Sequence, residues 1–250
     1  MLYMVGLGIY DEEDISIRGM KAIEDADEVI LECYTSSWKG RDGLKKIVDK
    51  DVEEVERSDL EESSVKILER AVDRDIVILV PGDPLVATTH VEILIQANKM
   101  NLETSVIHSS SIYSAVSETG LQIYKFGKTT TIPIPRKNYR PVSPYEVIGE
   151  NKEQGLHTLA LLDITNRPME VPEALGYLTE IENEKKEGVI DCEQKAVAFS
   201  AGPGKSRVVY AKIAEMLDMD FPTPAVLIFP GELHEKEEEA LETFSEEIHE

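Results

Sequence analysis

The sequence predicts an α/β protein with two lobes, each a mainly parallel sheet flanked by helices. Short apolar runs that read as strands alternate along the chain with longer segments whose apolar residues recur at helical spacing. This alternation is typical of parallel sheets, whose two faces both need helices to cover them. The alternation is interrupted once, near residues 118–130, so we expect one domain over residues 1–120 and a second over residues 121–250. A cleft between two such lobes is a common place for a small-molecule site.

The elements of the first lobe follow from its apolar runs and from the residues that bound them. Strands are expected at residues 2–5, 28–34, 75–80 and 105–107. Helices are expected after the acidic turn at residues 11–14, after the pair Ser58 and Glu61, after Thr88 or Thr89, and over residues 111–118. Acidic residues suit the positive end of a helix dipole, and a serine followed three residues later by glutamate is a capping box.

The second lobe begins with a stretch in which four prolines, between residues 133 and 144, exclude a long regular element. Helices are then expected at residues 146–154, 172–186 and 208–217, and strands at residues 158–163, 196–200 and 225–229. The final segment, residues 231–250, carries nine glutamates and one lysine. Such a charge run predicts a solvated helix or a frayed tail.

The composition excludes several classes of protein. A net charge of −23 over 250 residues argues against a nucleic-acid backbone as the main partner, because phosphate binding needs clustered Lys and Arg. Cys33 and Cys192 are too few for a four-thiolate metal site and lie far apart in sequence, so we expect no disulfide framework and a reduced, cytoplasmic location. No apolar run is long enough for a membrane span, and we identify no signal peptide at the N-terminus.

Two loops at strand ends are candidates for ligand binding. Gly6 and Gly8 end the first strand, but Asp11 stands where the dinucleotide-binding fingerprint needs a third glycine, so a tight turn without a ligand explains the pair as well. Residues 81–86 place two prolines around a Gly-Asp pair at the end of a strand, which is where open α/β sheets bind ligands. The backbone of such a loop suits a zwitterionic amino-acid group, and an ordinary rigid turn is the alternative.

Other catalytic motifs are absent or incomplete. The glycine-rich segment at residues 199–206 has Phe199 where the phosphate-binding loop requires glycine, so we expect only a strand-to-helix loop there. The sequence contains no His-Glu-x-x-His pair and no Gly-x-Ser-x-Gly elbow, so we expect neither a zinc site nor a hydrolase of that type. The histidines are expected to cap helices, lie on the surface or be satisfied in the core: His90, His108, His157, His234 and His249.

Taken together, these segments resemble the tetrapyrrole methylases. That family begins with a strand and a Gly-x-Gly turn, continues with Ala-Asp-x-Val, here residues 26–29, and then carries a Gly-Asp-Pro loop, here residues 82–84. Within the family, the chain is most similar to archaeal and eukaryotic diphthine synthases, through segments spread over nearly its whole length. These segments are residues 6–11, 34–36, 81–90, 111–115, 124–127, 155–158 and 230–234. Many relatives have an arginine at position 200, where this chain has Ser200, so a role for an arginine side chain there is in doubt.

The resemblance implies a two-domain tetrapyrrole-methylase fold, a homodimer, and S-adenosylmethionine as methyl donor in the cleft between the domains. It places the cofactor against Ile9, Asp83, Val86, Ser111, Ile112, Leu162, Ser200, Ala201 and His234. The acceptor it implies is a histidine of translation elongation factor 2 that carries an aminocarboxypropyl group, whose amino group is methylated repeatedly in diphthamide biosynthesis. No catalytic residue can be named, and no metal, nucleic acid or membrane partner is expected.

Two other functions are compatible with the same loops. One is a methyltransferase that acts on a precorrin-like tetrapyrrole, and the other is a non-catalytic protein that binds S-adenosylmethionine and regulates a partner. Residues 124–127 and 155–158 favour diphthine synthase over the first. The proline-rich stretch also carries Arg136, Lys137 and Arg140, a basic patch in an acidic chain that could dock the elongation factor or could be an exposed connector.

Overall fold

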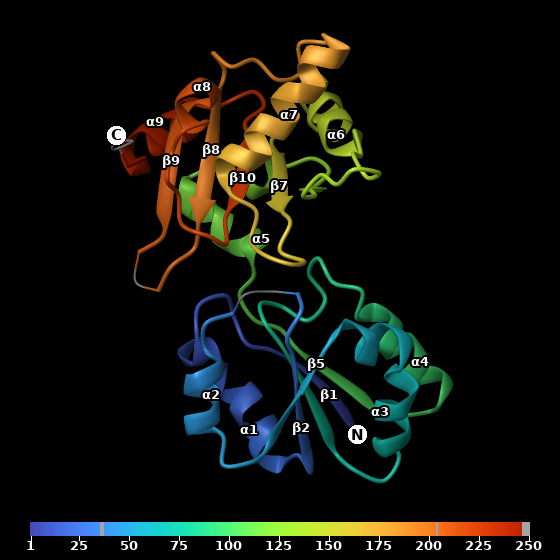
Figure 1. Cartoon of the computed structure of the whole chain (residues 1–250). Helices are drawn as coiled ribbons and strands as arrows, with labels where there is room; N and C mark the ends of the chain where they lie inside the picture. The colour runs from blue at the N-terminus through green and yellow to red at the C-terminus, as the bar shows by residue number, and fades with distance from the viewer. Residues whose placement is uncertain (36–37, 204, 247–250) are drawn as a thin grey trace. The chain divides into compact units, whose positions relative to one another are not determined.

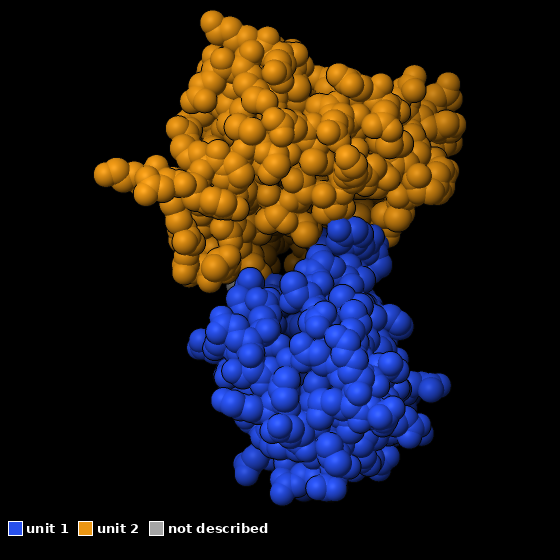
Figure 2. All heavy atoms as spheres, turned by 90° about the vertical axis from the view of Figure 1, so that its right-hand side faces the viewer, with its two compact units in different colours: residues 1–114 blue, residues 115–250 orange. Residues whose placement is uncertain are grey.

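A computed structural model describes residues 1–35, 38–203 and 205–246 of the chain. It divides into two compact units, Met1–Ser114 and Ala115–Glu250, which Figure 2 colours separately. The two units therefore meet between residues 114 and 115. The boundary expected from the sequence is at residue 120. Ser36 of the segment at residues 34–36, Gly204 of the glycine-rich loop and the last four residues, which include His249, lie outside the described residues.

Unit 1 is built on a parallel five-stranded sheet with the strand order β3-β2-β4-β1-β5 (Figure 1). The strands are β1 (Leu2–Gly6), β2 (Glu28–Glu32), β3 (Val52–Val55), β4 (Ile76–Val80) and β5 (Thr104–Ile107). Gly6 pairs with Val80, so β1 and β4 end at the same level. Because all five strands run the same way, their carboxyl ends lie along one edge of the sheet, and the loops that follow them share that edge.

Both faces of this sheet are buried, as the continuous apolar run of β4 predicts. Val77 and Leu79 pack in one cluster with residues of α1 (Ile17–Asp25) and α2 (Arg41–Ile47). Ile76, Ile78 and Val80 pack on the other face with residues of α3 (Ser64–Arg70) and α4 (Val91–Lys99). Alternate side chains of β4 thus pack into two apolar clusters, one on each face of the sheet.

Three details of unit 1 differ from the sequence-based expectation. The sequence predicts neither β3 nor α2. The edge strand β3 has no apolar run, because it carries two exposed glutamates between its valines. Ser58 does not cap α3; it lies in a π-helical turn, Ser58–Glu62, that precedes the helix. The residue before α4 is His90 rather than Thr88 or Thr89.

Unit 2 contains a mixed sheet with the order β6-β7-β10-β8-β9. Its strands are β6 (Thr130–Ile132), β7 (Thr158–Leu162), β8 (Lys195–Ser200), β9 (Arg207–Lys212) and β10 (Val226–Phe229). Only β6 and β7 pair in parallel; the other three pairings are antiparallel. The α/β class is confirmed, and the expectation of a mainly parallel sheet is correct for unit 1 and wrong for unit 2.

The antiparallel pairings follow from a strand that the sequence reading mistook for a helix. Residues 208–217 were expected to be helical, but β9 occupies the first part and only Ile213–Met216 form a helix, α8. The adjacent pair Val208 and Val209 is β-branched and favours a strand, which the apolar spacing alone did not reveal. A short loop joins β8 to β9, and Ser200 pairs with Arg207, so the two strands form a hairpin.

The helices of unit 2 pack mainly on one large apolar cluster. The longer ones are α6 (Ser143–Glu153), α7 (Val171–Lys185) and α9 (Glu235–Phe244), and short helical turns cover Val116–Thr119 and Ile123–Lys125. Tyr145 of α6, Leu178 of α7 and Leu227 of β10 are fully buried in the cluster. The C-terminal segment is not a frayed tail over its described part, because α9 buries Leu241 and Glu237 completely. Across the described ranges, no helix is both long and apolar enough to span a bilayer.

Candidate functional site

The loops after β1, β4 and β5 meet at the carboxyl edge of the unit 1 sheet. Gly8 N donates to Gly82 O over 3.2 Å, and Gly82 N donates to Gly8 O over 2.8 Å. A side chain at Gly6 would place its Cβ 2.7 Å from Gly82 O and 2.8 Å from Ser109 Cβ. The first loop therefore needs glycine because the backbones of its neighbours approach so closely.

Asp83 ties the β4 loop to the β5 loop. Its side chain is 5% exposed, and its Oδ1 accepts a hydrogen bond from Leu85 N over 3.0 Å. Its Oδ2 accepts from Ser109 N over 3.1 Å and lies 2.8 Å from Nδ1 of His108. Since both carboxylate oxygens already bond to the protein, the main work of this side chain is to shape the loops. Direct contact between Asp83 and a cofactor stays a prediction.

A buried histidine links the same loop to the residues that follow β2. His90 is 1% exposed; its Nδ1 lies 3.1 Å from Pro84 O and its Nε2 lies 3.2 Å from the Tyr34 hydroxyl. Because a carbonyl only accepts, Nδ1 carries the proton and Nε2 accepts from Tyr34. Burial lowers the pKa of His90, which favours this neutral form. Buried Glu32 in turn accepts from the backbone N–H groups of Tyr34 and Thr35.

Sequence reasoning missed Glu32, Tyr34, His90 and His108 as parts of this edge. A signal for two of them exists, because Glu32 follows the apolar run of β2 and His108 directly follows β5. The pairs Tyr34 with His90 and His108 with Asp83 are distant in sequence, however, and only the parallel sheet brings them together.

The structure gathers all five residues predicted in unit 1 at this edge. Ile9 follows Gly8 and is half-buried, and Asp83 and Val86 lie in the β4 loop. Val86 N donates to Asp83 O over 3.3 Å. Ser111 is buried, and Ile112 begins the short helix α5 (Ile112–Ala115) that follows the β5 loop.

Three of the residues predicted in unit 2 also share an edge. Leu162 is the last residue of β7, and Ser200, followed by Ala201, is the last residue of β8. Both strands run antiparallel to β10, which lies between them, so both end at the same edge. Ser200 Oγ donates to Pro224 O over 2.9 Å. The loop after Ser200 leads into β9, so the strand-to-helix connection expected there is wrong.

His234 lies at the opposite edge of the unit 2 sheet. It follows the carboxyl end of β10, which points away from the ends of β7 and β8. Its side chain is exposed and caps α9, since Nδ1 accepts from Lys236 N over 3.1 Å. Within this unit the structure does not bring His234 together with Leu162 and Ser200.

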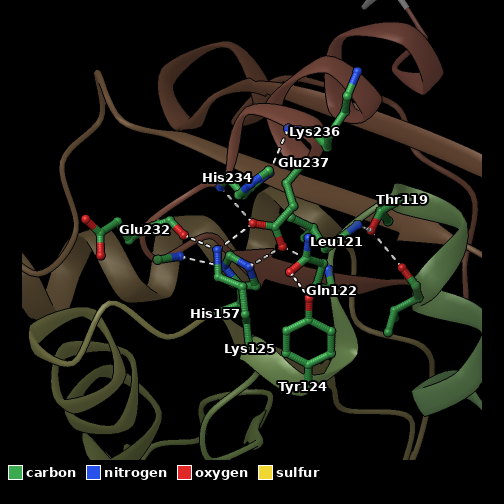
Figure 3. A network of polar contacts seen from close by, with 12 residues as sticks. Thr119, Leu121, Gln122, Tyr124, Lys125, His157, Glu232, His234, Lys236 and Glu237 are labelled. Carbon is green, nitrogen blue, oxygen red and sulfur yellow. Dashed lines mark hydrogen bonds and ion pairs between the residues drawn. The ribbon is translucent and has the colours of Figure 1, made fainter.

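His234 belongs instead to a network centred on the fully buried Glu237 (Figure 3). Glu237 accepts from Gln122 N over 2.9 Å and from His234 N over 2.8 Å, and it pairs with Lys125 Nζ. Its Oε1 lies 3.0 Å from His157 Nε2. Burial opposes ionisation of Glu237, but these hydrogen bonds outweigh it and lower its pKa to about 2.

The protonation of the neighbouring histidine follows from its other nitrogen. His157 Nδ1 accepts from Gly231 N over 2.9 Å, so Nε2 carries the proton and donates it to Glu237. Burial lowers the pKa of His157, which is therefore neutral. Residues 124–127, 155–158 and 230–234, which carry part of the family resemblance, thus meet in one network that anchors α9 to the sheet.

No metal-binding cluster accompanies these networks. Across residues 1–35, 38–203 and 205–246, no group of three or more His, Cys, Asp or Glu side chains is placed to hold a metal ion.

Comparisons with known proteins agree with this architecture. Residues 1–217 match the family model of the tetrapyrrole (corrin/porphyrin) methylases. A diphthine synthase of Methanocaldococcus jannaschii is 45% identical over 257 residues, covering 99% of this chain and 100% of the relative. One from Methanothermobacter thermautotrophicus is 47% identical over 242 residues, covering 94% of this chain and 91% of the relative.

The fold comparison agrees with the sequence comparisons. A crystal structure of a diphthine synthase superposes with a TM-score of 0.90 at 37% identity, covering 98% of this chain and 95% of that one. The chain therefore belongs to the diphthine synthases of the tetrapyrrole methylase family, and it is an S-adenosylmethionine-dependent methyltransferase.

Proposed function

We propose that this enzyme methylates the amino group of an aminocarboxypropyl-histidine on translation elongation factor 2, and that it transfers three methyl groups to give diphthine. The observation that carries the proposal is the full-length similarity to diphthine synthases, at 45% identity over 99% of this chain. The convergent loops at the carboxyl edge of unit 1 add a structural reason, because they provide a rigid ligand-binding edge where this fold class binds its ligands.

The residues fit S-adenosylmethionine through backbone shape more than through charge. Gly82 has a φ of +75°, and a Cβ built on it would meet only Ser110 O, at 3.9 Å, so open space lies beside this loop. We propose that Ile9, Asp83, Val86, Ser111 and Ile112 of unit 1 and Leu162, Ser200 and Ala201 of unit 2 line the cofactor. The predicted contact to His234 is kept as the weakest of the set, because the side chain already caps a helix.

S-adenosylmethionine supplies a methyl group that is already activated on a sulfonium. The task of the chain is then to align the acceptor amine with that methyl group, and proximity of this kind contributes about 7–11 kcal/mol. The amine must lose its proton before it reacts, so a poorly hydrated site that disfavours the ammonium form assists the reaction. Asp83 and His90 hold the loops in place, so that little reorganisation is needed when the ligand binds.

The test is to incubate the purified enzyme with S-adenosylmethionine and elongation factor 2 that carries only the aminocarboxypropyl modification, and to weigh the modified peptide. A gain of three methyl groups is expected. A fourth would indicate an additional carboxylate ester. No gain, in a protein shown to bind the cofactor, would contradict the proposal and favour a tetrapyrrole acceptor or a regulatory role.

The same resemblance supports two further parts of the proposal, namely that the enzyme is a homodimer and acts in the cytoplasm on a protein substrate. Light scattering of the purified protein would test the dimer, and a molar mass near that of one 28.0 kDa chain would contradict it.

A further inference from the structure

Unit 2 contains a pocket that none of the proposed cofactor residues lines. It has a volume of about 390 Å³ and lies where β6 and β7 end. One wall comes from Thr131 of β6 and from the proline-rich segment, which contributes Arg136 and Tyr139. The other wall comes from Asp163 and Thr165, in the loop after β7. The pocket therefore combines a cation, an anion, two threonine hydroxyls and a tyrosine side chain.

Arg136 is available to a ligand. Among the described residues its guanidinium makes no ion pair, and it lines the pocket. Arg140, by contrast, bonds Glu180 over 2.6 Å and stacks on the ring of Tyr177. The basic patch predicted from the sequence is thus reduced, because one of its three cations is engaged within the fold.

The backbone around Arg136 is fixed. Arg136 N donates to Tyr139 O over 3.0 Å, and Tyr139 N donates to Arg136 O over 2.9 Å, which closes a tight turn. Prolines at positions 133 and 135 restrict the chain that leads into it. A turn held in this way presents the arginine and the tyrosine at one rim of the pocket.

Asp163 supplies a fixed negative charge to the same pocket. Its carboxylate accepts from Ile134 N over 3.0 Å, from Thr165 N over 2.8 Å and from the Thr165 hydroxyl over 2.6 Å. Burial opposes its ionisation, but these bonds and the nearby charge of Arg136 together lower its pKa. Because Asp163 stays ionised, the pocket presents both signs of charge, which complements a group that bears an amine and a carboxylate on one carbon.

We propose that this pocket binds the aminocarboxypropyl group of the acceptor histidine, with the carboxylate on Arg136, the ammonium towards Asp163 and the imidazole against Tyr139; the ammonium must then release its proton before the amine is methylated. The inference rests on the proposed function and names where the acceptor is held. The methionine part of S-adenosylmethionine has the same chemistry. Leu162, a proposed cofactor residue, directly precedes Asp163, so the test measures the affinity for both ligands in order to separate them.

The test compares Arg136→Gln with Lys137→Gln, a neighbouring exposed cation that does not line the pocket. For Arg136→Gln we expect the KM for the modified elongation factor to rise about tenfold to a hundredfold, as for the loss of a charge-assisted hydrogen bond. The Kd for S-adenosylmethionine, measured by calorimetry, should not change. Arg136→Lys should restore part of the affinity, and Lys137→Gln should behave as the wild type. Melting temperatures check that each variant is folded.

Each other outcome overturns the inference in a distinct way. An equal loss of affinity for S-adenosylmethionine would show that the pocket binds the cofactor rather than the acceptor. An equal effect of Lys137→Gln would reduce the role of Arg136 to general attraction of an acidic partner, and an unchanged KM would remove any role. If the wild type itself fails to methylate the modified elongation factor, the proposed function has failed, and the placement of its acceptor fails with it.

Discussion

The buried carboxylates of Asp83 in unit 1 and Glu237 in unit 2 each join distant segments, and they differ in what surrounds them. Asp83 collects donors from loops at the carboxyl edge of the unit 1 sheet, and its histidine partner, His108, has a side chain that is 67% exposed. Glu237 collects donors from three segments of unit 2, and its histidine partner, His157, is fully buried. The first network reaches solvent through His108, at the edge where we propose that the cofactor binds, and the histidine of the second is enclosed.

The comparison shows that the same chemistry serves two purposes. A buried carboxylate surrounded by donors makes its neighbourhood rigid, and whether that rigidity serves binding or stability depends on what it immobilises. Asp83 immobilises loops at the proposed cofactor site, whereas Glu237 immobilises the helix α9. Residues 124–127, 155–158 and 230–234 are therefore explained by the architecture of unit 2 without assigning them chemistry.

The largest effect is expected when the Glu237 network is broken. Glu237→Ala leaves Lys125 without its carboxylate partner and His157 without an acceptor, and removing one member of a buried charged pair costs about 3–5 kcal/mol. Urea unfolding would measure this loss. The control is Glu239→Ala on the same helix, whose exposed pair with Lys236 should contribute less than about 1 kcal/mol. Equal losses in the two variants would show that the network does not anchor α9.

The Glu237 network also predicts that the stability of the protein falls at low pH. The pKa of Glu237 is about 2 in the folded protein, below its usual 4.5, so its contribution to stability is complete above pH 4.5 and is lost as the pH falls towards 2. The contribution is on the order of 3 kcal/mol. Melting temperatures of the wild type should therefore fall more steeply over this range than those of Glu237→Gln. Parallel curves would contradict the assignment.

A smaller effect, on binding rather than stability, is expected at the carboxyl edge of the unit 1 sheet. Gly6→Ala introduces a methyl group 2.7 Å from Gly82 O, so the loops after β1 and β4 must move apart. We expect the affinity for S-adenosylmethionine to fall about tenfold, equivalent to about 1.4 kcal/mol. Gly176→Ala is the matched control, because nothing lies within 4 Å of its added methyl group on α7, and it should raise stability by about 0.5–1 kcal/mol.

The smallest effect is expected at His234. His234→Ala removes a side-chain cap of α9, which should cost about 1 kcal/mol in urea unfolding, while the His234 N–H bond to Glu237 is kept. Titration of S-adenosylmethionine into the same variant tests the predicted cofactor contact. A fall in affinity with unchanged stability would contradict the capping role and support the resemblance.

Sequence patterns identified the elements whose environment is uniform and failed where it is mixed. β4 was recognisable because all five of its residues are apolar and buried. β3 was missed because its two central glutamates face solvent, and β9 was misread because its apolar residues fit a helical spacing as well. The direction of strand pairing in unit 2 depends on β9, so that error also produced the expectation of a mainly parallel sheet.

The candidate site, too, was predictable from the sequence only in part. The positions of Ile9, Asp83, Val86 and Ser111 came from the family resemblance, and the structure places each of them after the carboxyl end of a strand. The partners of Asp83 could not be inferred, because His108 and Ser109 lie about 25 residues further along the chain and only the sheet order makes them neighbours. The placement of His234 depends on the direction of β10, which no local pattern reveals.

The measurement that tests this account most directly is a calorimetric titration of S-adenosylmethionine into Asp83→Asn and Glu237→Gln, with urea unfolding of both. The account predicts that Asp83→Asn loses at least about tenfold in affinity with a modest loss of stability, because Asp83 shapes the binding loops. It predicts the reverse for Glu237→Gln, which should retain its affinity and lose stability. Retained affinity in Asp83→Asn together with lost affinity in folded Glu237→Gln would contradict the division of roles between the two networks.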